Sequence, residues 1–138
     1  MVETHKGGCF CGAVRYETKG TPVRVSVCSC EWCRKRTGSA LGLSVYFDDQ
    51  DIIFNDGGRT LFLLTSDAGR WLQTEFCPKC GTTVSWTLEF QPGKRGIAGG
   101  TFDPPVFWFV PERYAFAQNK PDWLHIDGDL EICEGMPD

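Results

Sequence analysis

Hydrophobic and polar residues alternate over short stretches of this chain, a pattern typical of half-buried β-strands. The clearest alternation runs from Val14 to Lys19, where Val, Tyr and Thr share one face and charged residues share the other. Further stretches rich in β-branched and aromatic residues are bounded by Gly, Asp, Asn or Pro, as strands commonly are. The pattern predicts strands at Ala13–Thr18, Val23–Cys28, Leu41–Phe47, Ile52–Phe54, Leu61–Thr65, Leu72–Phe76, Thr83–Glu89, Arg95–Thr101 and Trp108–Val110.

One segment, Glu31–Thr37, has the character of a short helix, and Gly38 follows it as a suitable C-cap. The 16 glycines and 8 prolines spread along the chain favour turns over long helices. We therefore expect a mainly β fold of antiparallel sheets with at most one or two short helices. The length of 138 residues predicts a single domain over residues 1–138.

Composition narrows the classes of function. Hydrophobic residues make up 41% of the chain, enough for one packed core. The net charge of −4 argues against a general nucleic-acid binder, whose affinity comes mostly from neutralising phosphates. No apolar run approaches the roughly 18–20 residues that span a bilayer, so we expect no membrane partner. The N-terminus has no apolar stretch typical of a signal peptide, which predicts a cytoplasmic location where paired cysteines usually hold metal.

Seven of the eight cysteines fall into three clusters with the spacing of metal ligands. The most specific cluster is Cys77-Pro78-Lys79-Cys80-Gly81, in which proline presets a tight turn and glycine supplies the positive φ that a knuckle needs. Cys9 and Cys11 lie on either side of Phe10, so that on an extended chain they share a face. The last cluster holds Cys28, Cys30 and Cys33, and Cys133 stands apart.

Ligand counting predicts a closed four-thiolate zinc site and a second site with three protein ligands. A structural zinc takes four ligands, whereas a catalytic zinc keeps three and leaves one position open. The first site would use Cys9, Cys11, Cys77 and Cys80, and the second Cys28, Cys30 and Cys33.

Three other arrangements of the cysteines remain open at the level of sequence. A single ribbon could join the Cys30–Cys33 pair to the Cys77–Cys80 pair. The trio could be a second structural site completed by His5, His125, Cys133 or a carboxylate. Alternatively, the cysteines could form disulfides, which suits an exported domain rather than a cytoplasmic one.

The cysteine motifs resemble those of the glutathione-dependent formaldehyde-activating (GFA) and CENP-V-like family. The run G-x-C-x-C-G-x-V-R-Y over Gly7–Tyr16 resembles the opening of that family. C-x-C-x-x-C-R-K-x-T-G-S over Cys28–Ser39 resembles its second motif, and F-C-x-x-C-G-T over Phe76–Thr82 its third. With Trp123 near the end, the resemblance covers most of the chain in order.

The resemblance implies an Mss4-like fold of antiparallel sheets around zinc, and the same division into structural and catalytic ligands. It also implies a carbon–sulfur lyase that joins glutathione and formaldehyde in S-hydroxymethylglutathione. Many members carry a histidine shortly after the proline matching Pro111, but Tyr114 stands at that place here. This departure leaves proton transfer by that residue, and the identity of the substrate, open.

Basic residues next to the trio are candidates for binding the thiol substrate. Arg34, Lys35 and Arg36 follow the last cysteine of the trio, and Arg34 is nearest to it. They could bind the carboxylates of glutathione or simply favour the C-terminal end of a helix. The five tryptophans are expected to pack in the core or at interfaces. The competing function is a zinc-stabilised binding module of Mss4-like type without catalysis, which has no need of a second thiolate cluster.

Overall fold

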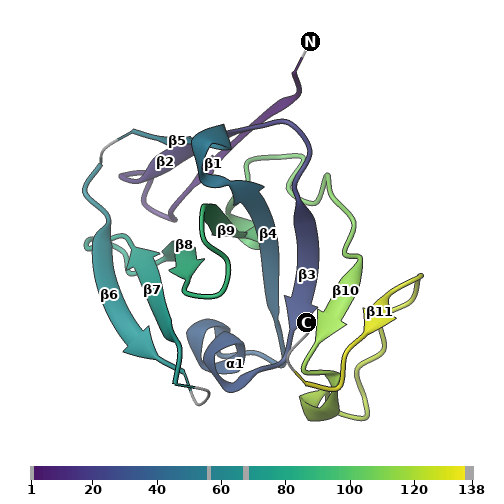
Figure 1. Cartoon of the computed structure of the whole chain (residues 1–138). Coiled ribbons are helices and arrows are strands. Elements are labelled where there is room, and N and C mark those ends of the chain that lie inside the picture. The colour runs from purple at the N-terminus through teal and green to yellow at the C-terminus, as the bar shows by residue number, and fades with distance from the viewer. Residues whose placement is uncertain (1, 56, 67–68, 136–138) are drawn as a thin grey trace.

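The computed structural model describes residues 2–55, 57–66 and 69–135, which form two β-sheets and a short helix (Figure 1). The smaller sheet has the strand order β1-β2-β5, and the larger has the order β11-β10-β3-β4-β9-β8-β7-β6. In Figure 1 the small sheet and the helix α1 lie at opposite ends of the large sheet. The strands are β1 Thr4–Gly8, β2 Arg15–Lys19, β3 Arg24–Cys28, β4 Gly42–Asp48, β5 Ile52–Phe54, β6 Thr60–Thr65, β7 Trp71–Phe76, β8 Thr83–Leu88, β9 Lys94–Ala98, β10 Arg113–Ala115 and β11 Glu131–Ile132.

The mainly β class predicted from the sequence is confirmed, with one refinement of strand direction. Most neighbouring strands pair antiparallel, but β10 runs parallel to β3 and β11 runs parallel to β10. The large sheet is therefore mixed. The parallel pair brings the C-terminal part of the chain beside β3, whose last residue, Cys28, pairs with Ala115.

The helix α1 spans Glu31–Thr37, as predicted. Its N-cap is Cys30, whose sulfur accepts a hydrogen bond from the Cys33 N–H. Gly38 closes it with φ 66°, and its N–H donates to the Arg34 carbonyl. Three short 3-10 turns, Asp49–Asp51, Gly99–Thr101 and Ala117–Asn119, lie elsewhere in the described chain.

Two strand predictions are wrong in whole or in part. Trp108–Val110 is a loop rather than a strand, because Phe109 packs into the core and Trp108 stacks on His5 with ring centroids 3.5 Å apart. Arg95–Thr101 is a strand only as far as Ala98, after which the chain enters a 3-10 turn. The strands β1, β10 and β11 were not predicted.

The core lies between the small sheet and the large one. Tyr16 of β2 and Ile52 of β5 are buried against Val45 and Phe47 of β4 and Ile97 of β9. Every second residue of β4 points into this core, as the alternation of its sequence predicts. Cys9 and Cys77 lie at the margin of the same cluster of buried residues, so the candidate metal ligands are continuous with the core.

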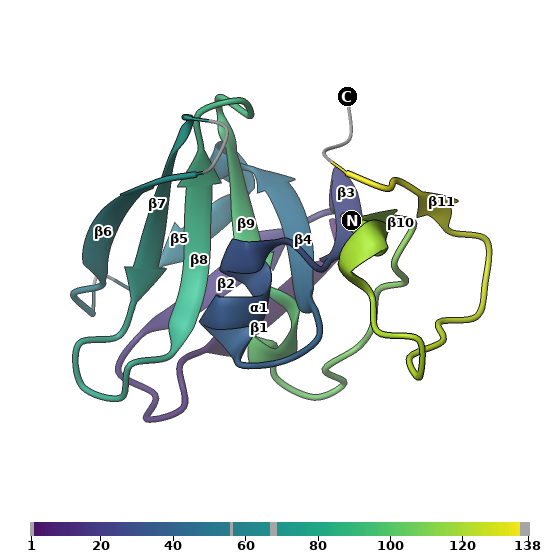
Figure 2. The same cartoon turned by 90° about the horizontal axis from the view of Figure 1, so that it is seen from below.

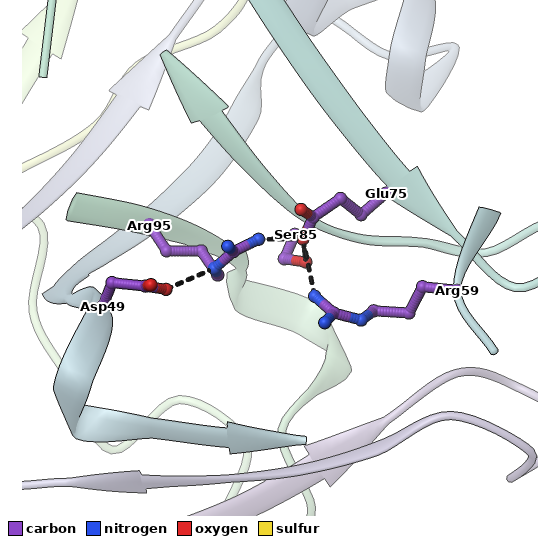
Figure 3. A network of polar contacts seen from close by, with 5 residues as sticks. All are labelled: Asp49, Arg59, Glu75, Ser85 and Arg95. Carbon is purple, nitrogen blue, oxygen red and sulfur yellow. Dashed lines mark hydrogen bonds and ion pairs between the residues drawn. The ribbon is translucent and has the colours of Figure 1, made fainter. Parts of the chain in front are cut away.

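A buried ion-pair network joins the central strands to the turn before β5 (Figure 3). Glu75 is only 3% exposed, and its carboxylate accepts hydrogen bonds from Arg59, Arg95 and the Ser85 hydroxyl. Arg95 also pairs with Asp49, which is 55% exposed, at 2.7 Å. The guanidinium of Arg59 lies 3.5 Å from the centroid of the Phe54 ring. Two arginines thus depend on one buried carboxylate.

Candidate metal centres

Four cysteines from two distant turns converge on one point. Cys9 and Cys11 lie in the turn between β1 and β2, and Cys77 and Cys80 lie in the turn between β7 and β8. Their four sulfurs all lie within 4.8 Å of one another. The Sγ atoms of Cys9 and Cys11, and those of Cys11 and Cys77, are each 3.7 Å apart. A tetrahedral zinc with Zn–S bonds of about 2.3 Å separates its sulfurs by about 3.8 Å, so the four donors fit that ion.

The two turns are similar, although the glycine that closes each lies four residues after Cys77 and three after Cys9. The Gly81 N–H donates to the Cys77 carbonyl at 2.8 Å, and Gly81 has φ 79°. The Gly12 N–H likewise donates to the Cys9 carbonyl at 3.1 Å, and Gly12 has φ 84°. The positive φ of each glycine lets the chain turn back beneath the sulfurs. The prediction that Cys9 and Cys11 share a face of an extended strand is wrong, because they lie in a knuckle like the second one.

Hydrogen-bond donors surround these sulfurs. The Val14 N–H donates to Cys9 Sγ at 3.2 Å, and the Lys79 N–H donates to Cys77 Sγ at 3.4 Å. Hydrogen bonds from the Thr82 hydroxyl and N–H lower the pKa of Cys80 to about 5. Donors of this kind favour thiolates over thiols, and the thiolate is the form that binds metal.

The remaining three clustered cysteines form a second group where β3 meets α1. Cys28 ends β3, Cys30 is the N-cap and Cys33 lies in the first turn of the helix. Their sulfurs also lie within 4.8 Å of one another. Hydrogen bonds from the Cys28 and Cys33 thiols lower the pKa of Cys30 to about 3, and the bond to Cys30 raises the pKa of Cys28. The three sulfurs therefore share their protons, and a divalent cation can replace them.

Within the described part of the chain, no further His, Cys, Asp or Glu joins the trio as a possible ligand. His5 stacks on Trp108 and contacts Glu3, and Cys133 Sγ lies 3.6 Å from the Glu131 carboxylate. His125 is exposed. The Cys77–Cys80 pair lies with Cys9 and Cys11 rather than with Cys30 and Cys33, and all eight cysteines are free.

Ser29 anchors the loop that carries the trio. It is fully buried between Cys28 and Cys30, and its hydroxyl donates to the Ala40 carbonyl at 2.8 Å. The Tyr114 hydroxyl donates to the same Ser29 oxygen at 2.7 Å. The Ser29 carbonyl accepts hydrogen bonds from Arg34 Nε and Asn119 Nδ2, both at 3.2 Å. Tyr114 therefore supports the loop, and its hydroxyl proton already takes part in the hydrogen bond to Ser29.

We predict that Tyr114→Phe lowers the free energy of unfolding by about 1 kcal/mol without changing the metal content, because it removes one hydrogen bond from a serine that keeps another. Ser29→Ala is expected to cost about 1–3 kcal/mol, because it leaves the buried Tyr114 hydroxyl without an acceptor. Urea denaturation and elemental analysis measure both. Loss of metal in Tyr114→Phe would contradict this supporting role.

A pocket of about 760 Å³ lies beside the trio loop. Arg34 and Asn119, which hold the Ser29 carbonyl, line it together with Leu41, Leu124 and Trp123. Trp123 is 75% exposed, so it forms a wall of the pocket rather than part of the core. Trp86, in contrast, is fully buried, as expected of a packing residue. Arg34 therefore contacts the trio loop through Ser29 and also lines the pocket.

The sequence did not single out Ser29 and Asn119, since their contacts come from strands and turns far along the chain. A serine between two cysteines indicates an anchoring residue only when the loop is known to be buried. Asn119 lies in the 3-10 turn Ala117–Asn119, which the pattern of residues does not reveal.

A comparison with protein-family models matches residues 4–119 to the glutathione-dependent formaldehyde-activating enzyme family. The match spans both cysteine groups and the Ser29 anchor. The chain belongs to the GFA family. Among solved structures, a Rhodobacter sphaeroides protein is similar to this GFA-family chain with a TM-score of 0.58 and 22% identity, covering 80% of this chain and 99% of that one. At this level of identity the likeness shows a shared fold. No helix in the described part of this GFA-family chain is long and apolar enough to cross a bilayer.

Proposed function

We propose that this GFA-family protein is a zinc-dependent carbon–sulfur lyase that acts on thiol–aldehyde adducts, with glutathione and formaldehyde as the model pair. The observation that carries the proposal is a trio of cysteine sulfurs, without a fourth protein ligand in the described chain, next to a pocket open to a small molecule. Three protein ligands and an exchangeable position are the arrangement of catalytic zinc.

The two cysteine groups have different tasks in this proposal. Cys9, Cys11, Cys77 and Cys80 hold a structural zinc that joins two distant turns, and Cys28, Cys30 and Cys33 hold the catalytic one. Zinc at the trio supplies a Lewis acid that keeps a bound thiol deprotonated near neutral pH. The donor sets suit zinc, since all seven ligands are soft thiolates.

The protein's own residues orient the reactants. The Ser29 anchor fixes the loop on which Cys28 and Cys30 lie, and so would orient these two ligands toward a bound metal. Arg34 uses Nε to hold Ser29, which leaves its terminal guanidinium nitrogens to pair with a carboxylate of the thiol substrate in the pocket. The thiolate sulfur then attacks the aldehyde carbon to form the C–S bond, and the former carbonyl oxygen takes up a proton from water.

The metal stoichiometry tests the division of the ligands. Wild-type protein is expected to hold close to two zinc ions per chain, and Cys30→Ser close to one with the fold retained. Cys133→Ser is the matched control, since Cys133 lies outside both groups, and it should keep two ions. Elemental analysis and circular dichroism measure metal and fold on the same samples.

The chemistry is tested by NMR detection of S-hydroxymethylglutathione against the spontaneous reaction. Wild-type protein should accelerate its formation, Cys30→Ser should lose the acceleration, and Arg34→Met should raise KM for glutathione about tenfold through the lost carboxylate contact. A wild-type chain with one zinc and no acceleration would instead support a zinc-stabilised binding module. The proposed reaction needs free thiolates, which places the protein in a reducing compartment such as the cytoplasm.

A further inference from the structure

The guanidinium of Arg36 is partly buried, and it has no hydrogen-bond partner among the described residues. It lies in the last turn of α1, and its guanidinium carbon is 4.3 Å from the centroid of the Trp86 ring and 5.0 Å from that of Trp32. Two of its nitrogens, Nε and Nη2, are buried and bonded to nothing in the described chain. The two indoles fix the plane of the guanidinium, so its N–H groups have a set direction.

One of these nitrogens faces the space next to the trio. A β-carbon built on Gly42 would lie 2.5 Å from Arg36 Nη2 and 3.4 Å from Cys33 Sγ. The arginine nitrogen and the cysteine sulfur are therefore neighbours across the bare backbone of Gly42, the first residue of β4. A side chain at position 42 would separate these two atoms. Because residue 42 is glycine, they can interact electrostatically.

Two buried guanidinium nitrogens without partners are unfavourable unless an opposite charge lies nearby. Without a metal, the trio provides at most the single negative charge of Cys30, which is not the cysteine next to Arg36. A divalent cation bound by three thiolates has a net charge of −1, and a fourth, anionic ligand brings it to −2. The anionic fourth ligand is therefore what adds negative charge next to Arg36.

We propose that Arg36 is a charge-compensating residue that makes the trio site select an anionic fourth ligand, a thiolate, over a neutral one. The inference rests on the proposed function in that it requires a divalent cation at the trio. It assigns to Arg36 a role distinct from that of Arg34, which holds the Ser29 carbonyl and faces the pocket. The motif C-R-K-x-T-G-S leaves the position of Arg36 open, so this selectivity is a property of the present chain rather than of the motif.

Cobalt substitution tests the selectivity without an assay of catalysis. Protein loaded with Co²⁺ is titrated with 2-mercaptoethanol, which binds as a thiolate, and separately with imidazole, which binds as a neutral ligand. Difference spectra in the ligand-field region report the trio, since a site closed by four cysteines has no position to exchange. The variants are Arg36→Met, which keeps a long side chain against the two indoles, and Arg36→Lys, which keeps the charge.

We expect Arg36→Met to weaken thiolate binding about tenfold or more and to change imidazole binding less than twofold, because a unit charge acts on the anion alone at this short range. Arg36→Lys should keep most of the thiolate affinity. Lys35→Met, one residue earlier and exposed, is the matched control and should leave both affinities unchanged. Arg36→Gln is a second neutral variant in case the methionine side chain disturbs the packing.

Three results overturn the inference, and they are distinguishable from one another. A wild-type chain that binds one cobalt ion overturns the proposed function and the role of Arg36 together. Two ions per chain with equal ligand preferences in wild type, Arg36→Met and Arg36→Gln overturn only the role of Arg36. An equal loss of thiolate and imidazole binding in the neutral variants also overturns it, since that result shows a structural effect on the site.

Discussion

Cys80→Ser is expected to abolish the cooperative folding of this protein. The four sulfurs of Cys9, Cys11, Cys77 and Cys80 join two turns far apart in the sequence, and two of these cysteines belong to the core. In small domains the free energy of binding a structural zinc is folding free energy, on the order of 10 kcal/mol. That is as large as the whole stability of a typical domain, about 5–15 kcal/mol. A single lost thiolate ligand therefore removes most of what keeps the domain folded.

The measurement is thermal and urea unfolding of purified Cys80→Ser, followed by circular dichroism, together with its zinc content. Cys30→Ser is the matched control, because it makes the same chemical change in the trio and should remain folded. A chelator added to wild-type protein should reproduce the unfolding of Cys80→Ser. A Cys80→Ser protein that unfolds at the wild-type temperature would show that the four cysteines hold no structural metal.

The second large effect is expected at Glu75. Its buried carboxylate is shared by Arg59, Arg95 and Ser85 (Figure 3). Glu75→Gln keeps the shape of the side chain but leaves Arg59 without a charge to pair with, and leaves Arg95 only the exposed Asp49. Breaking a buried ion pair on one side costs about 3–5 kcal/mol, because the other charge stays buried and uncompensated. We expect the free energy of unfolding to fall by about that amount.

Asp49→Asn is the matched control for the network. It is the same acid-to-amide change on a partner of Arg95, but Asp49 is 55% exposed. An exposed ion pair contributes about 0–1 kcal/mol, so the loss should be small. Urea denaturation of both variants with metal bound separates the two cases. Equal losses in Glu75→Gln and Asp49→Asn would show that burial of Glu75 does not set its contribution.

The elements predicted correctly from the sequence are those that depend on residues close together in the chain. The helix Glu31–Thr37 ends at Gly38, the C-cap that the sequence predicts, whereas its N-cap, Cys30, was not predicted as a cap. The short strand Ile52–Phe54 also lies where its apolar residues place it. For the cysteines, spacing and ligand counting gave the same two groups that the structure brings together.

The rest depends on contacts that no local pattern encodes. The strand β10, Arg113–Ala115, is only three residues long and exists because β3 offers it an edge. The aromatic run around Phe109 has the composition of a strand, yet it forms a loop in which Phe109 packs into the core. The sequence left open whether Arg36 binds a substrate or only favours the end of a helix, and only the fold shows that it lies against Trp86 and Gly42.

The parallel contact between β10 and β3 has a consequence for the order in which the protein matures on the ribosome. The knuckle ligands are all available once Cys80 has been translated, less than two thirds of the way along the chain. The trio is translated much earlier, but Tyr114 and Asn119, which hold its Ser29, emerge only near the end. A nascent chain therefore carries the trio on an unsupported loop through most of its synthesis, and the three sulfurs reach their final geometry last.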